Sequence, residues 1–278
     1  MRDRIRVGAV SYLNARPLYD GLERLDPRVQ LFLDYPSILA EMLRAGELDV
    51  GLIPSVEYLR GIGDHQSYKI IPGVSISTRG PVRSVKLLSR VALDEIKSLA
   101  LDQGSRTSQV LTQVWLAERH GVRNPRLETL AFAASPLEAR TDAVLLIGDR
   151  AMSVRDEAFL HVVDLGQAWK EMTGLPFVFA LWVARSEVDE SMFVNLLQRS
   201  RDDGLARVHE IAEKAANRMG LNPDFCEEYL TQNLCYEFDS NELAGFQLFA
   251  EKAAALGLAP QGAPLVFAHD RLHPATRG

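Results

Sequence analysis

Short runs of β-branched and aliphatic residues alternate with helical patterns through the first two thirds of this 278-residue chain. The predicted strands lie at residues 5–10, 29–34, 50–53, 69–75, 82–90, 98–101, 143–147, 160–163 and 177–183. Pro17, Pro36 and Pro54 stand where a first-turn proline opens a helix, so each of these predicted helices begins just after a strand. Strands that alternate with helices build parallel βαβ units, and the pattern therefore predicts an α/β fold.

Two lobes are expected, because a chain of this length is near the size at which a single core divides. Residues 45–54 and 140–149 are similar to each other: each ends a helix, places an Asp before an apolar strand and finishes in a turn. Duplication and a chance likeness of two ordinary αβ units are both open. The long runs at 82–90 and 177–183 are predicted to cross between the lobes. The predicted first lobe is therefore residues 1–90 plus 184–278, and the second is 91–183.

Long amphipathic helices without intervening strands are predicted after residue 189, over 190–219, 223–236 and 241–256. Such a block is better suited to packing onto a lobe than to forming a site. The chain after Pro260 is rich in proline and is predicted to be irregular.

The composition excludes several classes of protein. A formal net charge of -6 argues against a nucleic-acid surface, which usually shows a basic excess. No uncharged apolar run approaches the ~20 residues that span a bilayer, and the start has no secretory signal pattern, so no membrane partner and a cytoplasmic location are expected. Cys226 and Cys235 have the spacing of neither a metal knuckle nor a redox pair. HExxH, GxGxxG and GxxxxGK[ST] motifs are absent, so neither a metal nor a cofactor is expected.

The loop after the first predicted strand is the first of three candidate binding loops. Ligands of open α/β sheets bind beyond the carboxyl ends of the strands. Asn14 offers amide donors and an acceptor, Arg16 can clamp a carboxylate with two hydrogen bonds, and Ser11 is a supporting contact. A capped helix start with a solvent-facing Arg16 is an equally good interpretation.

The second loop lies directly before the helical run at 109–119 and contains Ser105, Arg106, Thr107 and Ser108. The free N–H groups and the positive dipole end of a helix N-terminus bind anions. Plain N-capping by Ser105 is the alternative, but it needs only one hydroxyl. These residues therefore favour an anion site.

The third loop contains Gly148 and Asp149, after a strand without polar residues. Gly148 allows a ligand to approach the backbone, while Asp149 can cap the next turn or face the cleft, with capping favoured. None of the six histidines falls in the three loops, so no catalytic histidine is evident. The residues alone predict a two-lobed protein that binds a small carboxylate, and leave open whether it is an enzyme or a solute receptor.

A resemblance to a known family adds to this prediction. The matching motifs are Ser-Tyr-Leu-Asn-Ala-Arg-Pro-Leu at 11–18, Asp-Val-Gly-Leu-Ile-Pro-Ser at 49–55, Gly-Pro-Val-Arg-Ser-Val at 80–85, Ser-Arg-Thr-Ser at 105–108, Leu-Ile-Gly-Asp-Arg-Ala at 146–151, and Asp-Leu-Gly with Thr-Gly-Leu-Pro-Phe-Val-Phe-Ala between 164 and 180. In these motifs the chain resembles the chorismate dehydratases of the futalosine route to menaquinone, which have the type 2 periplasmic-binding-protein fold. The resemblance implies a lyase that removes water from chorismate to give 3-[(1-carboxyvinyl)oxy]benzoate without a cofactor.

The resemblance also implies roles for single residues. Asn14 orients the enolpyruvyl carboxylate of the substrate, which removes the proton, and Ser84 assists at the ring. Ser105 to Ser108 hold the second carboxylate. Glu57 and Asp149 are the alternative bases, although a carboxylate repels a dianion unless it is neutralised. A solute-binding protein or a sensor for a small carboxylate is the alternative function, although a receptor needs an export signal and a sensor needs an output domain such as a helix-turn-helix. The sequence makes no prediction of the oligomeric state.

Overall fold

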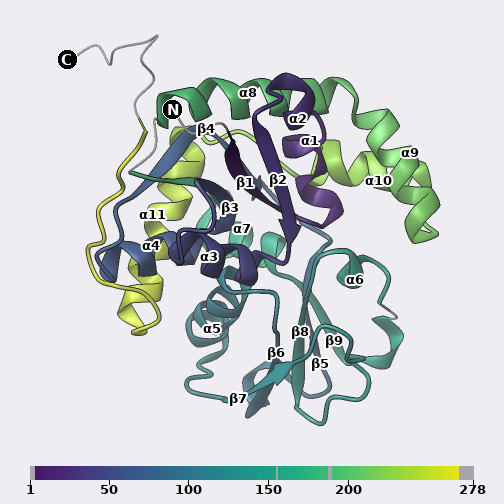
Figure 1. Ribbon diagram of the computed structural model, residues 1–278. Coiled ribbons are helices and arrows are strands. Elements are labelled where there is room, and N and C mark those ends of the chain that lie inside the picture. The colour runs from purple at the N-terminus through teal and green to yellow at the C-terminus, as the bar shows by residue number, and fades with distance from the viewer. Residues whose placement is uncertain (1–3, 155, 187–189, 269–278) are drawn as a thin grey trace.

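The computed structural model describes residues 4–154, 156–186 and 190–268, and in them the chain forms two α/β lobes, each built on one five-stranded sheet (Figure 1). The first sheet has the order β2-β1-β3-β10-β4 and contains β1 (Ile5–Val10), β2 (Val29–Asp34), β3 (Val50–Pro54), β4 (Tyr68–Thr78) and β10 (Phe177–Arg185). The second has the order β7-β6-β8-β5-β9 and contains β5 (Val85–Ser89), β6 (Ser98–Asp102), β7 (Arg126–Leu130), β8 (Ala143–Ile147) and β9 (His161–Asp164).

The two sheets have the same pattern of strand directions. In the first, β1 pairs in parallel with β2 and β3, and β10 runs antiparallel between β3 and β4. In the second, β6 pairs in parallel with β7 and β8, and β5 runs antiparallel between β8 and β9. The predicted two-lobed α/β fold is therefore confirmed.

The two similar segments of the sequence, residues 45–54 and 140–149, have the same structural role, one in each lobe. The carboxylate of Asp49, just before β3, accepts hydrogen bonds from the backbone N–H of Arg6 at 2.9 Å and from its guanidinium at 2.6 Å. The carboxylate of Asp142, just before β8, accepts from the N–H groups of Lys97 and Ser98 at 2.9 and 2.8 Å. Each Asp thus fixes the start of the neighbouring parallel strand.

The chain crosses between the sheets in two short segments, at residues 79–84 and 174–176. The predicted bounds, 1–90 plus 184–278 and 91–183, put β5 in the first lobe, whereas β5 pairs with β8 and β9. They also split β10 between the lobes, although the whole strand pairs in the first sheet. The strand pairing therefore moves the proposed boundaries to just before Val85 and just before Phe177.

Helices cover both sheets. Their bounds are α1 (Arg16–Tyr19), α2 (Leu22–Leu25), α3 (Pro36–Arg44), α4 (Ser55–Gly63), α5 (Thr107–His120), α6 (Asp149–Met152), α7 (Leu165–Thr173), α8 (Glu190–Ala206), α9 (Val208–Met219), α10 (Pro223–Glu228) and α11 (Ser240–Ala255), with short 3-10 helices at Leu13–Ala15, Leu93–Glu95 and Asp156–Ala158. The predicted helix over 190–219 is two helices with a break at Arg207. The predicted helix over 223–236 is α-helical only to Glu228 and continues as a π-helix, Tyr229–Asn233.

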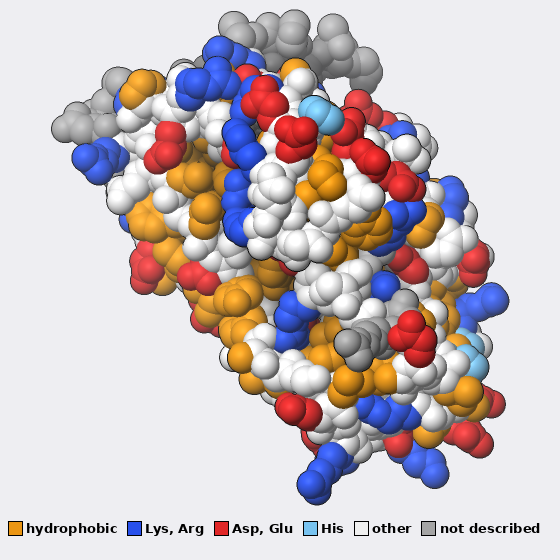
Figure 2. All heavy atoms as spheres, turned by 90° about the vertical axis from the view of Figure 1, so that its right-hand side faces the viewer, with side chains coloured by type: hydrophobic (Ala, Val, Ile, Leu, Met, Phe, Trp, Pro, Cys, Tyr) orange, Lys and Arg blue, Asp and Glu red, His pale blue; other side chains and the backbone are white. Residues whose placement is uncertain are grey.

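The C-terminal helices pack on the first lobe, with α8 along one end of its sheet and α11 against β10 (Figure 1). The largest buried side chains include Trp169 of α7 and Trp182 of β10, so the core continues from one lobe toward the other. On the face drawn in Figure 2, acidic and basic side chains are interspersed over both lobes. No helix of residues 4–154, 156–186 and 190–268 is both long enough and apolar enough to cross a membrane.

Candidate functional site

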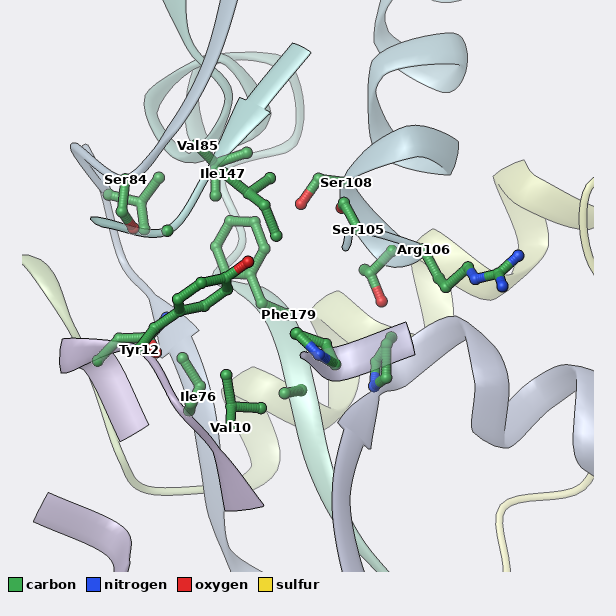
Figure 3. Close-up of a pocket in the computed structure, with 17 residues that line it drawn as sticks. Val10, Tyr12, Ile76, Ser84, Val85, Ser105, Arg106, Ser108, Ile147 and Phe179 are labelled. Carbon is green, nitrogen blue, oxygen red and sulfur yellow. The ribbon is translucent and has the colours of Figure 1, made fainter. Parts of the chain in front are cut away.

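A cavity of about 60 Å³ lies between the lobes, where loops at strand ends of the two sheets face each other (Figure 3). Small-molecule sites have volumes of roughly 300–1,000 Å³, so an organic ligand needs more room than the cavity has in this structure. Seven of the predicted site residues line it: Asn14, Ser84, Ser105, Arg106, Thr107, Ser108 and Gly148. The cavity thus joins all three of the loops that the sequence indicated.

Asn14 reaches the cavity from the 3-10 helix that follows β1. Its Oδ1 atom is buried and has no hydrogen-bond partner among the described residues. A buried acceptor that stays unpaired costs about 1–3 kcal/mol, so this atom is suited to a donor on a bound ligand.

Tyr12, which the sequence analysis did not select, contributes a large part of the wall. Its ring extends into the cavity in Figure 3 and lies against Gly148 of the opposite lobe. A Cβ atom on Gly148 would come within 2.8 Å of that ring, and the residue has a φ of +66°. Gly148 therefore allows a close approach to the backbone. The group that approaches in this structure is Tyr12, and the approach of a ligand stays a prediction.

Ser84 lies on the first crossover, whose backbone is fixed by two residues of the second lobe. The carboxylate of Asp164, which caps α7, accepts the N–H groups of Val82 and Arg83 at 3.0 and 2.6 Å. The carbonyl oxygen of Ser84 accepts the N–H of Gly148 at 2.8 Å. The Asp-Leu-Gly motif at 164 thus holds the crossover that presents Ser84 to the cavity.

The second predicted loop forms the N-terminus of α5. Its N-cap residue is Arg106, without a side-chain cap, so plain capping by Ser105 is not what the structure contains. Thr107 Oγ1 accepts the N–H of Val56 at 3.3 Å and lies 3.4 Å from Ser55 Oγ, which brings the first turns of α4 and α5 together. The positive ends of two helix dipoles therefore meet beside the cavity, an arrangement that attracts an anion.

The charged group of Arg106 leaves the cavity. Its guanidinium pairs with Glu41 of α3 at 3.1 Å, and Figure 3 shows the side chain pointing away from the other lining residues. Arg106 is the only charged residue among the described residues that line the cavity. Hydroxyls, an amide and helix N-termini thus supply its polar surface, while Ile76, Val85, Ile147 and Phe179 supply its apolar wall.

The remaining predicted residues, Ser11, Arg16 and Asp149, do not line this cavity. The carboxylate of Asp149 accepts the N–H of Leu13 at 3.0 Å and so ties the two lobes together, and it makes no cap hydrogen bond at the start of α6. Burial raises the pKa of Asp149, against the hydrogen bond from Leu13 and the nearby charges of Arg218 and Arg16. Arg16 lies 3.8 Å from Asp20, outside the cavity.

Glu57, the other carboxylate considered as a base, lies in an outer groove. It pairs with Arg60 at 2.8 Å and with Arg44 at 3.5 Å.

No cluster of three or more possible metal ligands occurs in the described part of the chain.

Aromatic side chains from the two lobes are in contact beside Tyr12, which lines the cavity. The rings of Tyr35, after β2, and Phe132, after β7, stack with centroids 3.8 Å apart, and Tyr12 meets Tyr35 edge-on at 6.0 Å. The lobes are therefore in contact around the cavity in this structure.

Comparison with known proteins identifies relatives over most of the chain. A family model described as menaquinone biosynthesis matches residues 5–255. The chain is 33% identical to the chorismate dehydratase of Thermus thermophilus over 270 residues, covering 91% of this chain and 95% of that one. It is 23% identical to the chorismate dehydratase of Campylobacter jejuni, covering 91% and 99% of the two chains.

Solved structures share the fold at lower sequence identity. A protein from Archaeoglobus fulgidus superposes with a TM-score of 0.72 at 18% identity, covering 92% of this chain and 99% of that one. The periplasmic aliphatic sulphonate-binding protein of Escherichia coli superposes with a TM-score of 0.63 at 17% identity, covering 100% and 98%. These similarities confirm the predicted periplasmic-binding-protein fold.

Proposed function

Because this chain belongs to the menaquinone biosynthesis family, whose model matches residues 5–255, we propose that it is a hydro-lyase that removes water from chorismate. The product is 3-[(1-carboxyvinyl)oxy]benzoate, in which the enolpyruvyl ether of the substrate is retained. The membership indicates an enzyme of menaquinone biosynthesis. The cavity supports the choice of substrate through the polar groups on its opposite walls.

One observation carries the proposal: a buried, unpaired Asn14 Oδ1 faces a cavity whose other side is the uncapped N-terminus of α5. Chorismate is a compact dianion with a ring hydroxyl. In our proposal the N–H groups of Asn14 bind one carboxylate, and Oδ1 accepts the hydrogen of the ring hydroxyl. Ser105, Thr107 and Ser108, with the first N–H groups of α5, bind the other carboxylate.

The reaction breaks the C–H bond at the ring carbon that bears the ether, and its electron pair forms the new ring double bond. The C–O bond to the neighbouring hydroxyl breaks at the same time, and the departing hydroxide receives the proton that was removed from carbon and leaves as water. Aromatisation of the ring supplies the driving force. The protein then has to position the substrate and stabilise the developing charge, and fixed dipoles do both.

The substrate's own enolpyruvyl carboxylate is the base in this proposal. The two carboxylates of the protein that the sequence offered do not line the cavity: Glu57 is paired with arginines in an outer groove, and Asp149 binds the Leu13 N–H. Asn14 orients the reacting carboxylate, and Ser84 donates a hydrogen bond at the ring. Ser11 and Arg16 then act only by supporting the loop that carries Asn14.

Incubation of the purified protein with chorismate tests the activity. The expected result is a product lighter than chorismate by one water, detected by mass spectrometry, with an aromatic absorption spectrum. Binding of chorismate in calorimetry without any conversion would instead make the protein a solute-binding protein.

Three variants test the base. We expect Asn14→Ala to lower kcat about 100-fold or more, because misplacement of a reacting group has an effect of this order. Glu57→Gln and Asp149→Asn, which keep the shape of the side chains, should stay within about threefold of the unchanged protein in kcat, well under the effect of losing a positioned acid or base. A near-total loss of activity in only one of these two carboxylate variants would contradict catalysis by the substrate carboxylate.

A further inference from the structure

The C-terminal helical block contacts the crossover that carries Ser84, although none of its described residues lines the cavity. Its π-helix, Tyr229–Asn233, packs against the crossover at residues 79–84, which carries Ser84. π-Helical turns are rare and occur often at functional sites. The sequence pattern indicated only a packing role for this block.

The hydroxyl of Tyr229 is bonded to Ser84. It donates a hydrogen bond to Ser84 Oγ at 2.8 Å, and the tyrosine is only 1% exposed. Tyr229 does not line the cavity, so it meets the site only through its neighbours. Burial raises the pKa of Tyr229 well above its ordinary value, although hydrogen bonds with Ser84 and with Asn14 lower it in part. One neutral phenol therefore lies next to both residues that the proposed mechanism uses at the reacting atoms.

Ser84 also needs support because the residue before it has an unfavourable backbone conformation. Arg83 has a φ of 61°, a left-handed geometry that costs a residue with a side chain about 1 kcal/mol or more. The same helical block also holds this turn. Glu228 pairs with Arg83 at 2.6 Å, and the side-chain amide of Asn233 donates to the carbonyl of Pro81 at 3.0 Å.

We propose that Tyr229 is a positioning residue for the dehydration, which directs the hydroxyl hydrogen of Ser84 toward the substrate. This inference rests on the proposed function. A serine hydroxyl has one hydrogen and two acceptor lone pairs. Because Tyr229 donates into one lone pair, the hydrogen of Ser84 is left for a second partner in the cavity. A hydroxyl that accepts a hydrogen bond is also a stronger donor, so the same contact polarises Ser84 toward the departing oxygen.

The variant Tyr229→Phe removes only the phenolic oxygen. We expect kcat to fall about 10- to 100-fold, as for misplaced catalytic groups, with KM within about threefold, because the carboxylate contacts remain. The matched control is Tyr58→Phe, in the first lobe. The Tyr58 hydroxyl donates to the Pro264 carbonyl and accepts the Val266 N–H, at 3.0 and 2.8 Å, outside the cavity. This control should lose stability in urea unfolding and keep its kcat.

A double-mutant cycle with Ser84→Ala tests whether Tyr229 acts through Ser84. The kcat of the double variant should be close to that of Ser84→Ala alone. It should be far above the kcat expected if the losses of the two single variants were multiplied. The double variant leaves neither hydroxyl of this pair unpaired. If Tyr229→Phe fails to fold, the kcat of the double variant can therefore still be compared with that of Ser84→Ala. An unchanged kcat in Tyr229→Phe, an equal loss in Tyr58→Phe or multiplicative losses in the cycle would overturn the inference. If the unchanged protein does not convert chorismate, the proposed function itself fails, which is a different result from conversion that does not depend on Tyr229.

Discussion

Asp149 and Asp142 show how the surroundings of a single carboxyl group set its contribution to stability. Burial raises the pKa of Asp149 in the folded protein above its ordinary value of 3.8. The folded state therefore holds this proton more tightly than the unfolded state, and the associated stability is lost as the pH rises from 3.8 through the folded pKa. Asp142 has the opposite sign. Burial raises its pKa, but hydrogen bonds from Lys97 and Ser98 together lower it by more, so its net pKa is below 3.8.

The two aspartates give a matched pair of variants. Asp149→Asn keeps an oxygen for the Leu13 N–H and removes a buried charge, so we expect a higher free energy of unfolding at pH 7 than in the unchanged protein. Asp142→Asn should lower it at the same pH. Both differences should shrink as the pH falls, that of Asp149 at higher pH than that of Asp142, because the folded pKa of Asp149 is raised and that of Asp142 is lowered. Urea unfolding from pH 3 to 7 measures them, and equal signs at pH 7 would contradict this account.

At the scale of the elements, the strands and proline-started helices were predictable because each has a local signal. Strand β7 was missed because four of its five residues are exposed, so no apolar run marks it. The run at 82–90 was extended too far because Val82 is buried in the crossover rather than paired in β5. The polar loops of the site were predictable from their place at strand ends. The apolar wall was not, because Ile76 and Phe179 are indistinguishable from core residues in a sequence.

A Cβ atom added at Gly148, in the turn between β8 and α6, would have two effects: backbone strain and a steric contact. Gly148→Ala adds strain at φ +66° and a contact with the ring of Tyr12 at 2.8 Å. We expect a loss of about 1–2 kcal/mol in stability. We also expect kcat/KM to fall about tenfold, because a displaced wall misplaces the substrate.

Gly174→Ala is the control for that prediction, because Gly174 has a φ of +74° and a Cβ atom there would meet no described atom within 4 Å beyond its chain neighbours. It should lose a similar stability of roughly 1 kcal/mol and keep its kcat/KM. A similar loss of kcat/KM in both variants would mean that the Tyr12 contact has no part in the effect.

In the whole molecule, the lobes are held together by contacts of different strength. The stacked pair of Tyr35 and Phe132 lies beside Tyr12, which lines the cavity, and Arg150 supports Phe132 by a hydrogen bond to its carbonyl. The ion pair of Lys252 and Glu118, at 2.8 Å, joins α11 to α5 at a site outside the cavity. Stacked aromatic pairs contribute about 0.5–1.5 kcal/mol beyond their burial, whereas exposed ion pairs contribute about 0–1 kcal/mol. Long-range pairs of this kind carry no local sequence signal.

Phe132→Ala should therefore raise the KM for chorismate about 3- to 10-fold, since about 1.4 kcal/mol of lobe contact is equivalent to a factor of ten. Glu118→Gln, which removes the ion pair outside the cavity, should change KM less than about twofold. Steady-state kinetics at 0.15 M salt compare the two. A larger effect of Glu118→Gln would show that the distant ion pair, rather than the aromatic stack, governs closure.

The position of Ser84 on a crossover links the proposed reaction to the arrangement of the lobes. Asn14 belongs to one lobe, Ser105 to the other, and Ser84 to the segment that joins them. We therefore expect separation of the lobes to disperse the three polar groups that the proposed reaction uses, so that turnover and product release follow one another and do not overlap in time.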